Sequence, residues 1–510
     1  MEEVVQVESK QNIQEQAVKI ALDTVYWLGK ENIPTEKYPS LLELLNKHCS
    51  SVKDLNKAKN ATYNFRIIAN EMQQAIADAL MYEIVDSMKQ ARWISVLTDE
   101  STDITVKGKL IIYVKFVDIN FDVKSHYLRD FEIGEKGAAT FTDMITSVLK
   151  ERASVMTGVK NGVSARLKKL SPYLTNIHCV AHRLTLCTSQ AATKLDTLQQ
   201  YKTVLTNLYY YFKGSSVRSS RLAKIQEVFD LPQIKVREMH DIKWFSFYNV
   251  LEGIYKSWDA LLELYLEKKD GLYTAEFKSL LVEQDGEVKL YNHALEHEVQ
   301  QEKLAESTIS SFVENLINNL QKRFPSDSLS ILSACEALAM RDLSFVSQSE
   351  DFQYGTDKIE ILLDQYATPK GDPMIQPPVN GDKAKSEYAL LKPLVLQQQY
   401  PRDKLDVLWK IIFQFHKEQF PNLIELATIV LSMPVQTAIC ERGFSVQNPI
   451  KTAPRNRLGD ARLRILMTIS IEGPSFKKFD SEKSFNEFKT KKKRRIFQKL
   501  TCDIYSGNQN

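Results

Sequence analysis

Apolar residues recur at intervals of three and four positions through most of the first ninety residues, which is the pattern of amphipathic helices. The stretches QEQAVKIALDTVYWLGKEN and FRIIANEMQQAIADALMYEIVDSMKQ both follow it, and Pro34 and Pro39 interrupt the region between them. Because proline breaks a helical run, the pattern predicts two or three separate helices in this region.

The period of the pattern changes at about residue 91. Three segments alternate or run apolar and are rich in β-branched and aromatic residues: WISVLTDE (93–100), KLIIYVKFVD (109–118) and SHYLRDFEI (125–133). Short polar links around Gly108 and Asn120 separate them. The three segments are therefore predicted to form an antiparallel meander.

A helical pattern returns after these strands. It predicts a helix over residues 138–151, a short strand over 176–182 and further helices from about 183 to 400. The proline- and glycine-rich stretch TPKGDPMIQPPVNGD (368–382) is the best candidate for a linker. Strongly apolar helices are predicted after it.

This order of elements predicts an α+β fold that is mostly α. We expect an incomplete RNase H-like mixed sheet that is interrupted by a large all-helical insertion. The predicted parts are an N-terminal helical region, the first part of the core, the helical insertion, a C-terminal region that completes the core and a basic tail: 1–90, 91–183, 184–400, 401–475 and 476–510.

The composition is that of an ordinary soluble protein, with 510 residues of which 43% are hydrophobic and 26% charged. No apolar run approaches the roughly 20 residues that cross a membrane, and the acidic N-terminus lacks a secretory pattern. Six scattered cysteines form no disulfide framework. We expect a reducing compartment, no membrane association and no small-molecule substrate.

The net charge of +3 conceals an uneven distribution. Residues 477–499 contain ten Lys or Arg and three acids, so the rest of the chain is mildly acidic. The run KTKKKRR (489–495) has the composition of a nuclear-import signal or a phosphate-binding segment, and the alternative is a solvated terminus.

The sequence LTDESTD carries the first acidic cluster. Asp99 ends a strand-like run and is followed by Glu100 and Asp103. Two-metal phosphoryl chemistry needs carboxylates from separate elements to converge, so this cluster alone is not a site. The alternative is a polar strand end or helix cap.

The segment NIHCVAHRLTLC offers a second group, in which Cys179 and His182 have the two-residue gap common in zinc sites. A structural zinc site needs four ligands, and a second pair is missing. We therefore expect no metal here, and packing with hydrogen bonding for these residues.

Two further positions combine polar or aromatic groups with apolar surroundings. Glu441 and Arg442 lie in an apolar helical pattern, where the alternative to chemistry is a structural ion pair. Trp244 in IKWFSF is either a core residue or a platform for base stacking.

Taken together and in order, these stretches resemble the hAT superfamily of DNA transposases and the host proteins derived from it. The matching stretches are VYWLGKENIP, VLTDESTDI, ASVMTGVKNGVSARLKKL, NIHCVAHRLTL, IKWFSF, RF at 323–324 and AICERGFSVQNPIKTAPRNRL. They run from about residue 25 to 473, so the resemblance covers nearly the whole chain.

The resemblance implies an RNase H-like core that is interrupted by a helical insertion and closed by a C-terminal dimerisation segment. Family members cut and join DNA with three acids and divalent metal, of which the first maps to Asp99 and the last to Glu441. Cys179 and His182 match the family's Cys/His pair. Trp244 matches the tryptophan of the insertion that works at the DNA end.

The second acid is where this sequence departs from the family. A strand and an Asp-Gly pair usually precede ASVMTG, whereas here the helical pattern MITSVLKE continues into RASVMTG, with Glu151 and Arg152 in place of the pair. Losing a metal-binding carboxylate lowers the rate greatly, because charge on the reacting oxygens is no longer neutralised. No zinc-finger pattern precedes residue 90 either.

We therefore expect no enzymatic activity and no cofactor. The alternative is a metal-dependent DNA transposase or nuclease that takes its second acid from Glu151 or Asp143 and binds Mg²⁺. A third interpretation is a nucleic-acid binder that does not cut. It would use residues outside the acidic cluster, namely Trp244, Arg455, Arg457, Lys491, Lys492, Lys493, Arg494 and Arg495.

The expected function is that of a domesticated nuclear scaffold that self-associates or binds related hAT proteins, with weak nucleic-acid binding. Its interface is predicted from the apolar C-terminal helices: Leu408, Ile411, Phe415, Leu426, Ile429 and Phe444. The alternative for these residues is packing against the chain's own insertion.

Overall fold

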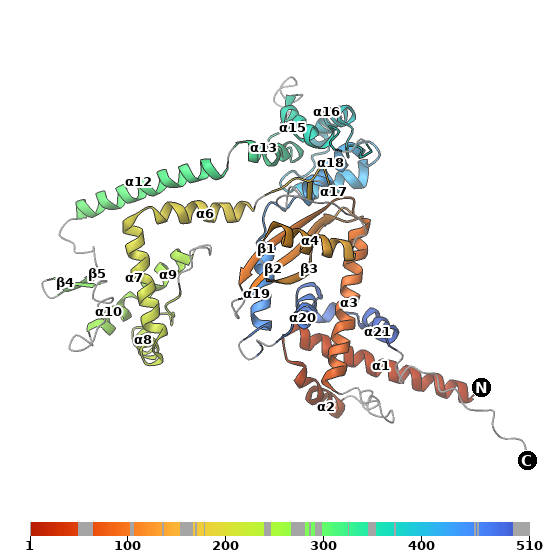
Figure 1. The fold of residues 1–510 in the computed structure, drawn as a ribbon, viewed down its shortest axis with the longest axis horizontal. Helices are drawn as coiled ribbons and strands as arrows, with labels where there is room; N and C mark the ends of the chain where they lie inside the picture. The colour runs from red at the N-terminus through yellow and green to blue at the C-terminus, as the bar shows by residue number, and fades with distance from the viewer. Residues whose placement is uncertain are drawn as a thin grey trace, which may run out of the picture. The chain divides into compact units, whose positions relative to one another are not determined.

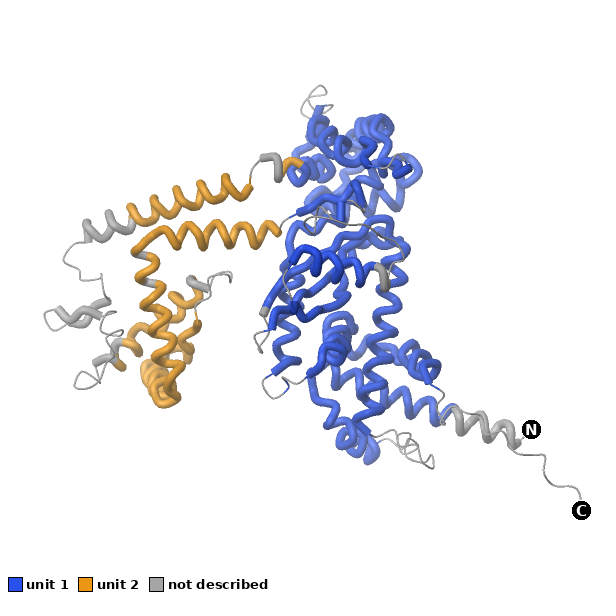
Figure 2. The backbone as a smooth tube through the Cα atoms, viewed as in Figure 1, with its two compact units in different colours: residues 1–177, 331–510 blue, residues 178–330 orange. Residues whose placement is uncertain are grey.

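The structure is a computed structural model. It describes residues 2–48, 65–102, 107–134, 137–152, 167–168, 171–177, 179–238, 246–266, 281–284, 287–290, 298–324, 326–344, 353–371, 374–452, 455 and 458–492. The chain forms two compact units (Figure 2). The first unit combines Met1–Ile177 with Ile331–Asn510, and the second consists of His178–Ser330.

The N-terminal region is helical, as predicted, and it packs against the C-terminal end of the chain (Figure 1). One apolar core joins both ends, through residues such as Val18, Leu22, Ile469, Phe485 and Phe488. The elements are α1 (Glu2–Lys30), α2 (Tyr38–His48) and α3 (Arg66–Gln90) with α20 (Asp460–Glu472) and α21 (Ser481–Thr490). The N-terminal helices thus belong to the same unit as the sheet.

The three predicted strands form one sheet in the order β1-β2-β3. The strands are β1 (Ile94–Thr102), β2 (Gly108–Val117) and β3 (Val123–Ile133), and the meander is confirmed. Both neighbouring pairs are antiparallel, so among the described residues this sheet is purely antiparallel rather than mixed. Its central strand reads as a nearly continuous apolar run because it is covered on both faces.

Different helices cover the two faces of the sheet. Leu110, Ile112, Val114 and Phe116 face α3 and α4 (Ala138–Arg152). On the opposite face, Leu97, Ile111 and Tyr113 pack against α19 (Ala438–Ile450) and α20. We call these the α4 face and the α19 face.

The largest core lies in the helices that follow residue 330, around the fully buried Trp409. They are η4 (Cys335–Leu338), α15 (Thr356–Tyr366), α16 (Gly381–Gln397), α17 (Leu405–His416) and α18 (Pro421–Ser432). Residues 331–400 therefore lie in the first unit, whereas the predicted insertion extended to residue 400. A helical pattern shows that a face is apolar, but it does not show which partner covers that face.

The second unit is mainly helical. Its elements are α6 (Val180–Thr193), α7 (Asp196–Lys213), α8 (Ser216–Val228), α9 (Ser246–Lys256), α10 (Trp258–Leu266), β4 (Leu281–Gln284), β5 (Glu287–Leu290) and α12 (Glu298–Arg323). The boundary between the units falls within α13 (Ser326–Ala334), because the second unit ends at Ser330. The β4-β5 hairpin was not predicted. The strand predicted over residues 176–182 is wrong, because α6 begins at Val180.

Among the described residues, no helix combines the length and apolar character that crossing a membrane requires.

Candidate functional site on the α19 face

Asp99 lies near the end of β1 and on the α19 face. Its register partner on β2 is Ile111, which belongs to the same cluster as Leu97 and Cys440 of α19. Successive side chains of a strand alternate between faces, so Asp99 lies on the same side as Leu97. One oxygen of its carboxylate accepts a hydrogen bond from the backbone N–H of Glu100, at 3.0 Å.

Glu441 is carried by α19, which packs on the same face because a glycine lets the helix approach the sheet closely. A Cβ at Gly443 would lie 2.5 Å from Cδ1 of Ile111 and 2.6 Å from the hydroxyl of Tyr113. Glu441 comes two residues earlier and is exposed, and α19 contacts both β1 and β2. The fold thus brings together the two elements that carry Asp99 and Glu441.

A further carboxylate on this face was missed by the sequence analysis. Asp130 of β3 is the register partner of Ile111, so Asp99, Ile111 and Asp130 form one row across the sheet. Only 5% of Asp130 is exposed, and its carboxylate accepts a hydrogen bond of 2.6 Å from the hydroxyl of Tyr127. Burial raises the pKa of Asp130, against the opposing effects of Tyr127 and of the Lys109 ammonium.

The irregularity in the β2-β3 pairing explains why Asp130 was missed. The register shifts between Ile112 and Tyr113, so the alternation along β3 is interrupted. A one-residue slip moves every later side chain to the other face, and a bulge has this effect locally. The pattern SHYLRDFEI therefore did not reveal which face Asp130 occupies.

A buried cation lies beside this row. The side chain of Lys109 is fully buried, and its ammonium contacts Oδ1 of Asp460 at 2.7 Å and Oε2 of Glu132 at 3.6 Å. Lys109 is two residues before Ile111 on β2, hence on the same face. A fixed positive charge opposes the binding of a metal cation nearby.

The helix that carries the alternative second acids covers the other side of the sheet. Ile145, Val148 and Leu149 of α4 pack on the α4 face, away from Asp99. Asp143 is exposed, and Glu151 lies in the last turn of the same helix. In the described part of the chain, no three His, Cys, Asp or Glu side chains are grouped so that they could hold a metal ion.

Cys179 and His182 interact through a helix cap. The sulfur of Cys179 accepts a hydrogen bond from the backbone N–H of His182, at 3.5 Å, and Cys179 is the N-cap of α6. Capping satisfies a backbone donor that the first helical turn leaves without a partner. This geometry accounts for the spacing of the pair without a metal.

Three of the basic residues predicted to bind nucleic acid contact other residues of the same chain. Arg455 donates to the backbone carbonyl of Asn32 at 3.0 Å, Lys491 forms an ion pair with Asp78, and Lys492 contacts Glu71 at 2.6 Å. Trp244, Arg457, Lys493, Arg494 and Arg495 lie outside the described residues.

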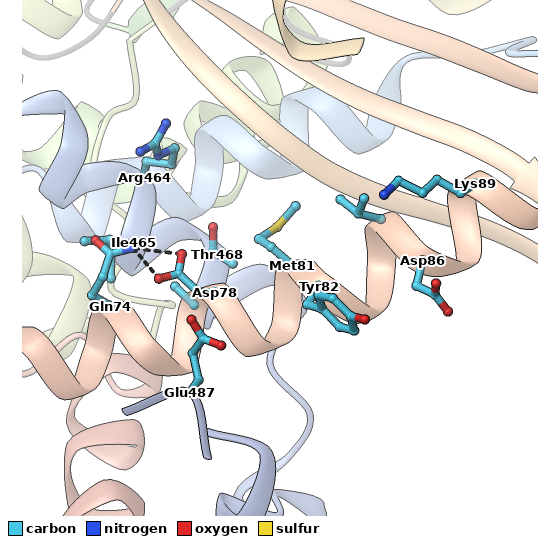
Figure 3. Close-up of a pocket in the computed structure, with 12 residues that line it drawn as sticks. Gln74, Asp78, Met81, Tyr82, Asp86, Lys89, Arg464, Ile465, Thr468 and Glu487 are labelled. Carbon is cyan, nitrogen blue, oxygen red and sulfur yellow. Dashed lines mark hydrogen bonds between the residues drawn. The ribbon is translucent and has the colours of Figure 1, made fainter. Parts of the chain in front are cut away.

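The start of the basic tail lies against a groove whose lining includes both acidic and basic residues. Asp78 belongs to a cavity of about 460 Å³ between α3, α20 and α21, where it also accepts two hydrogen bonds from Gln74 (Figure 3). Asp86 and Glu487 line the same cavity. A phosphate group would therefore have to compete with Asp78 and Glu487 for Lys491, and with Glu71 for Lys492.

The predicted interface residues divide into two groups. Leu408 and Leu426 are fully buried and Ile429 is 6% exposed, so these three belong to the core of the protomer, and the structure corrects their assignment to an interface. Phe444 and Ile411 are partly buried. Phe415 is 72% exposed.

Phe415 continues an apolar stripe along α17. Val407 is 39% exposed, and residues 407, 411 and 415 follow one another at intervals of four, which places them on one face of the helix. The sequence analysis missed Val407, although its spacing to Ile411 and Phe415 was a usable signal.

Comparison with protein families gives two matches, both within the first unit. Residues 10–161 match the family described as ZMYM1/FAM200, RNase-like domain. Residues 387–474 match the hAT family C-terminal dimerisation region. The resemblance to the hAT superfamily is confirmed. The RNase-like match contains the sheet with Asp99 and Asp130, and the match to the dimerisation region contains α17 and α19.

Proposed function

We propose that this protein is a catalytically inactive, hAT-derived scaffold of the nucleus that self-associates through the exposed stripe of α17. The observation that carries the proposal is the stripe of Val407, Ile411 and Phe415 within the matched dimerisation region. A large exposed aromatic residue next to aliphatic neighbours is a typical interface anchor.

The loss of catalysis is supported by the charges of the α19 face. Asp99 and Glu441 lie on elements that pack together, but the buried ammonium of Lys109 lies on the same face of the sheet as Asp99 and contacts Asp460 and Glu132. The helix of Asp143 and Glu151 covers the opposite face. A second acid from that helix would have to act from the wrong side of the sheet.

A nuclear location is supported by the basic run 489–495. Nucleic-acid binding receives less support, since Lys491 and Lys492 pair with acids of α3. Each of these exposed ion pairs contributes only about 0–1 kcal/mol, so a receptor or a polyanion can displace them.

Self-association is tested with Phe415→Asp, because a buried, unpaired carboxylate at the centre of an interface is strongly unfavourable. Light scattering of the wild-type protein is expected to give twice the chain mass of 58.6 kDa, and the variant is expected to give the mass of one chain. The control is Ile119→Asp, which places the same charge on a residue that is 65% exposed and outside the matched dimerisation region. A monomeric wild-type protein, or equal disruption by both variants, would refute the proposal.

The absence of catalysis is tested by titrating Mg²⁺ and Mn²⁺ into the protein and measuring its Tm. A metal site filled at a hundred times its Kd would raise the unfolding free energy by about 2.7 kcal/mol. We expect no change in Tm at millimolar metal. A stabilisation that Asp99→Asn removes would show that the α19 face binds the metal.

A further inference from the structure

The outer edge of β1 has no neighbouring strand among the described residues. β1 pairs with β2 alone, and the sheet order is β1-β2-β3. Every second residue of such an edge turns its backbone N–H and C=O away from the sheet. Exposed edges of this kind are templates for pairing with another chain, and proteins usually block them.

A cavity of about 610 Å³ runs along this edge. Residues 94, 95, 96 and 98 of β1 form one wall, α4 contributes Phe141 and Ile145, and Ile429 and Met433 lie at the end of α18. Cavities that bind ligands typically measure about 300–1,000 Å³. The edge therefore faces a pocket with largely apolar walls.

The charges of the cavity define the chemistry of its occupant. Arg92 is the one charged residue among those that line it, and its guanidinium contacts Glu425 at 2.8 Å. The other oxygen of Glu425 accepts a hydrogen bond from the indole of Trp93 at 2.5 Å. Among the described residues the cavity thus offers no unpaired charge, and an occupant with neutral, apolar side chains suits it.

We propose that the cavity binds an extended, apolar segment of a partner protein, which adds a fourth strand to the edge of β1. The alternating partial charges of the edge N–H and C=O groups are complementary to another extended backbone, which a small apolar molecule does not provide. Five extended residues span about 17 Å, the length of residues 94–98. Self-association through α17 is a separate property, and this inference does not depend on it.

The probe is a synthetic ten-residue peptide of alternating threonine and valine with a lysine at each end. Its matched control is the same peptide with N-methyl groups on alternate backbone amides, which keeps the side chains and removes the hydrogen bonds to β1. Hydrogen exchange of residues 94–98 and calorimetric titration report binding. The full chain is used, both as wild type and as Phe415→Asp, so that a failure of self-association is recognised separately.

We expect the peptide to slow exchange of the β1 amides by at least about tenfold, and the N-methylated peptide to bind at least about tenfold more weakly. If both peptides bound with equal affinity, the cavity would bind their side chains without hydrogen bonds to the edge of β1. Strong protection of residues 94–98 without any peptide would show that the edge is already covered. Either result overturns the proposal.

Two serines of the same register row provide matched protein variants. Ser95 on β1 and Ser125 on β3 are both partners of Lys115, at opposite edges of the sheet. Ser95→Arg is expected to abolish peptide binding, because it places an unpaired charge in the cavity, while Ser125→Arg is expected to leave binding unchanged. Equal Tm values for the two variants establish that both are folded, and equal loss of binding would refute the proposal.

Discussion

The two faces of the three-stranded sheet have different chemistry although they share the same strands. The α4 face is apolar along β2, with Leu110, Ile112, Val114 and Phe116. The α19 face places Asp130 and Lys109 among Ile111 and Tyr113, and both charged residues are buried.

The comparison distinguishes the side chains that packing of a sheet requires from charged side chains that packing does not require. Burying charge costs free energy that an apolar side chain of similar size would not, so a sheet needs no such groups in order to fold. The apolar side chains of the α4 face are all that packing requires. The charged row on the α19 face is therefore not required by packing, and the buried ammonium of Lys109 lies beside it.

The largest expected effect comes from removing that internal cation. Lys109→Met keeps most of the side-chain volume but leaves buried Asp130 without its nearby positive charge. We expect the unfolding free energy to fall by about 3 kcal/mol at pH 7, at the lower end for buried pairs because Asp460 and Glu132 keep access to water. Urea denaturation measures it.

Lys115→Met is the control for this change. Lys115 lies on the same strand and donates to the neutral backbone carbonyl of Met433 at 2.9 Å, so its replacement is expected to cost about 1 kcal/mol or less. If both variants lost the same stability, the charged row would have no special role on this face.

The next effect concerns the close approach of α19. Gly443→Ala adds a Cβ that would lie within 2.6 Å of Ile111 and Tyr113, and overpacking of this kind costs about 1–3 kcal/mol. We expect the unfolding free energy of Gly443→Ala to fall by about 2 kcal/mol, and thermal unfolding measures this decrease. Gly459→Ala is the control, since nothing lies within 4 Å of its Cβ position. Equal stability of the two variants would mean that α19 does not pack on the sheet as described.

The smallest effect is a pH dependence. Because burial raises the pKa of Asp130 above its ordinary value of 3.8, the folded state holds this proton more tightly than the unfolded state. The resulting stabilisation is complete below the ordinary pKa and is lost as pH rises through the raised one.

Asp130→Asn removes this dependence and keeps an acceptor for Tyr127. Relative to wild type, the variant should therefore gain stability as pH rises from the ordinary pKa of 3.8 through the raised pKa of Asp130. Denaturation curves across that range measure the difference. A difference that is constant or shrinks with pH would show that Asp130 is not held as a buried carboxyl.

Local patterns in the sequence were sufficient for most of the individual elements. The segments 93–100, 109–118 and 125–133 became strands within a few residues of their predicted ends, and the helix over 138–151 became α4. These elements are recognisable because side-chain periodicity reflects burial of one face, which local spacing encodes. The family resemblance was also readable from short ordered motifs.

Local patterns did not predict which residues belong to which compact unit. Residues 331–400 have the helical pattern of the insertion, yet they pack around Trp409 in the first unit. Similarly, Leu408 and Phe415 look alike as apolar positions of one helix, but one is fully buried and the other 72% exposed. Which face of a helix remains uncovered depends on neighbours that are distant in the chain.

By itself, the sequence determined most of the helices, the meander, the hAT resemblance and the elements that carry Asp99 and Glu441, since each depends on residues close together in the chain. The tertiary structure alone decided that Asp130 and Lys109 share a face with Asp99, that the edge of β1 faces an apolar cavity, and that the α17 stripe is exposed. These properties depend on a register shift and on packing between distant segments. The physical reason is that burial and electrostatic interaction follow distance in space, which one strand or helix does not specify.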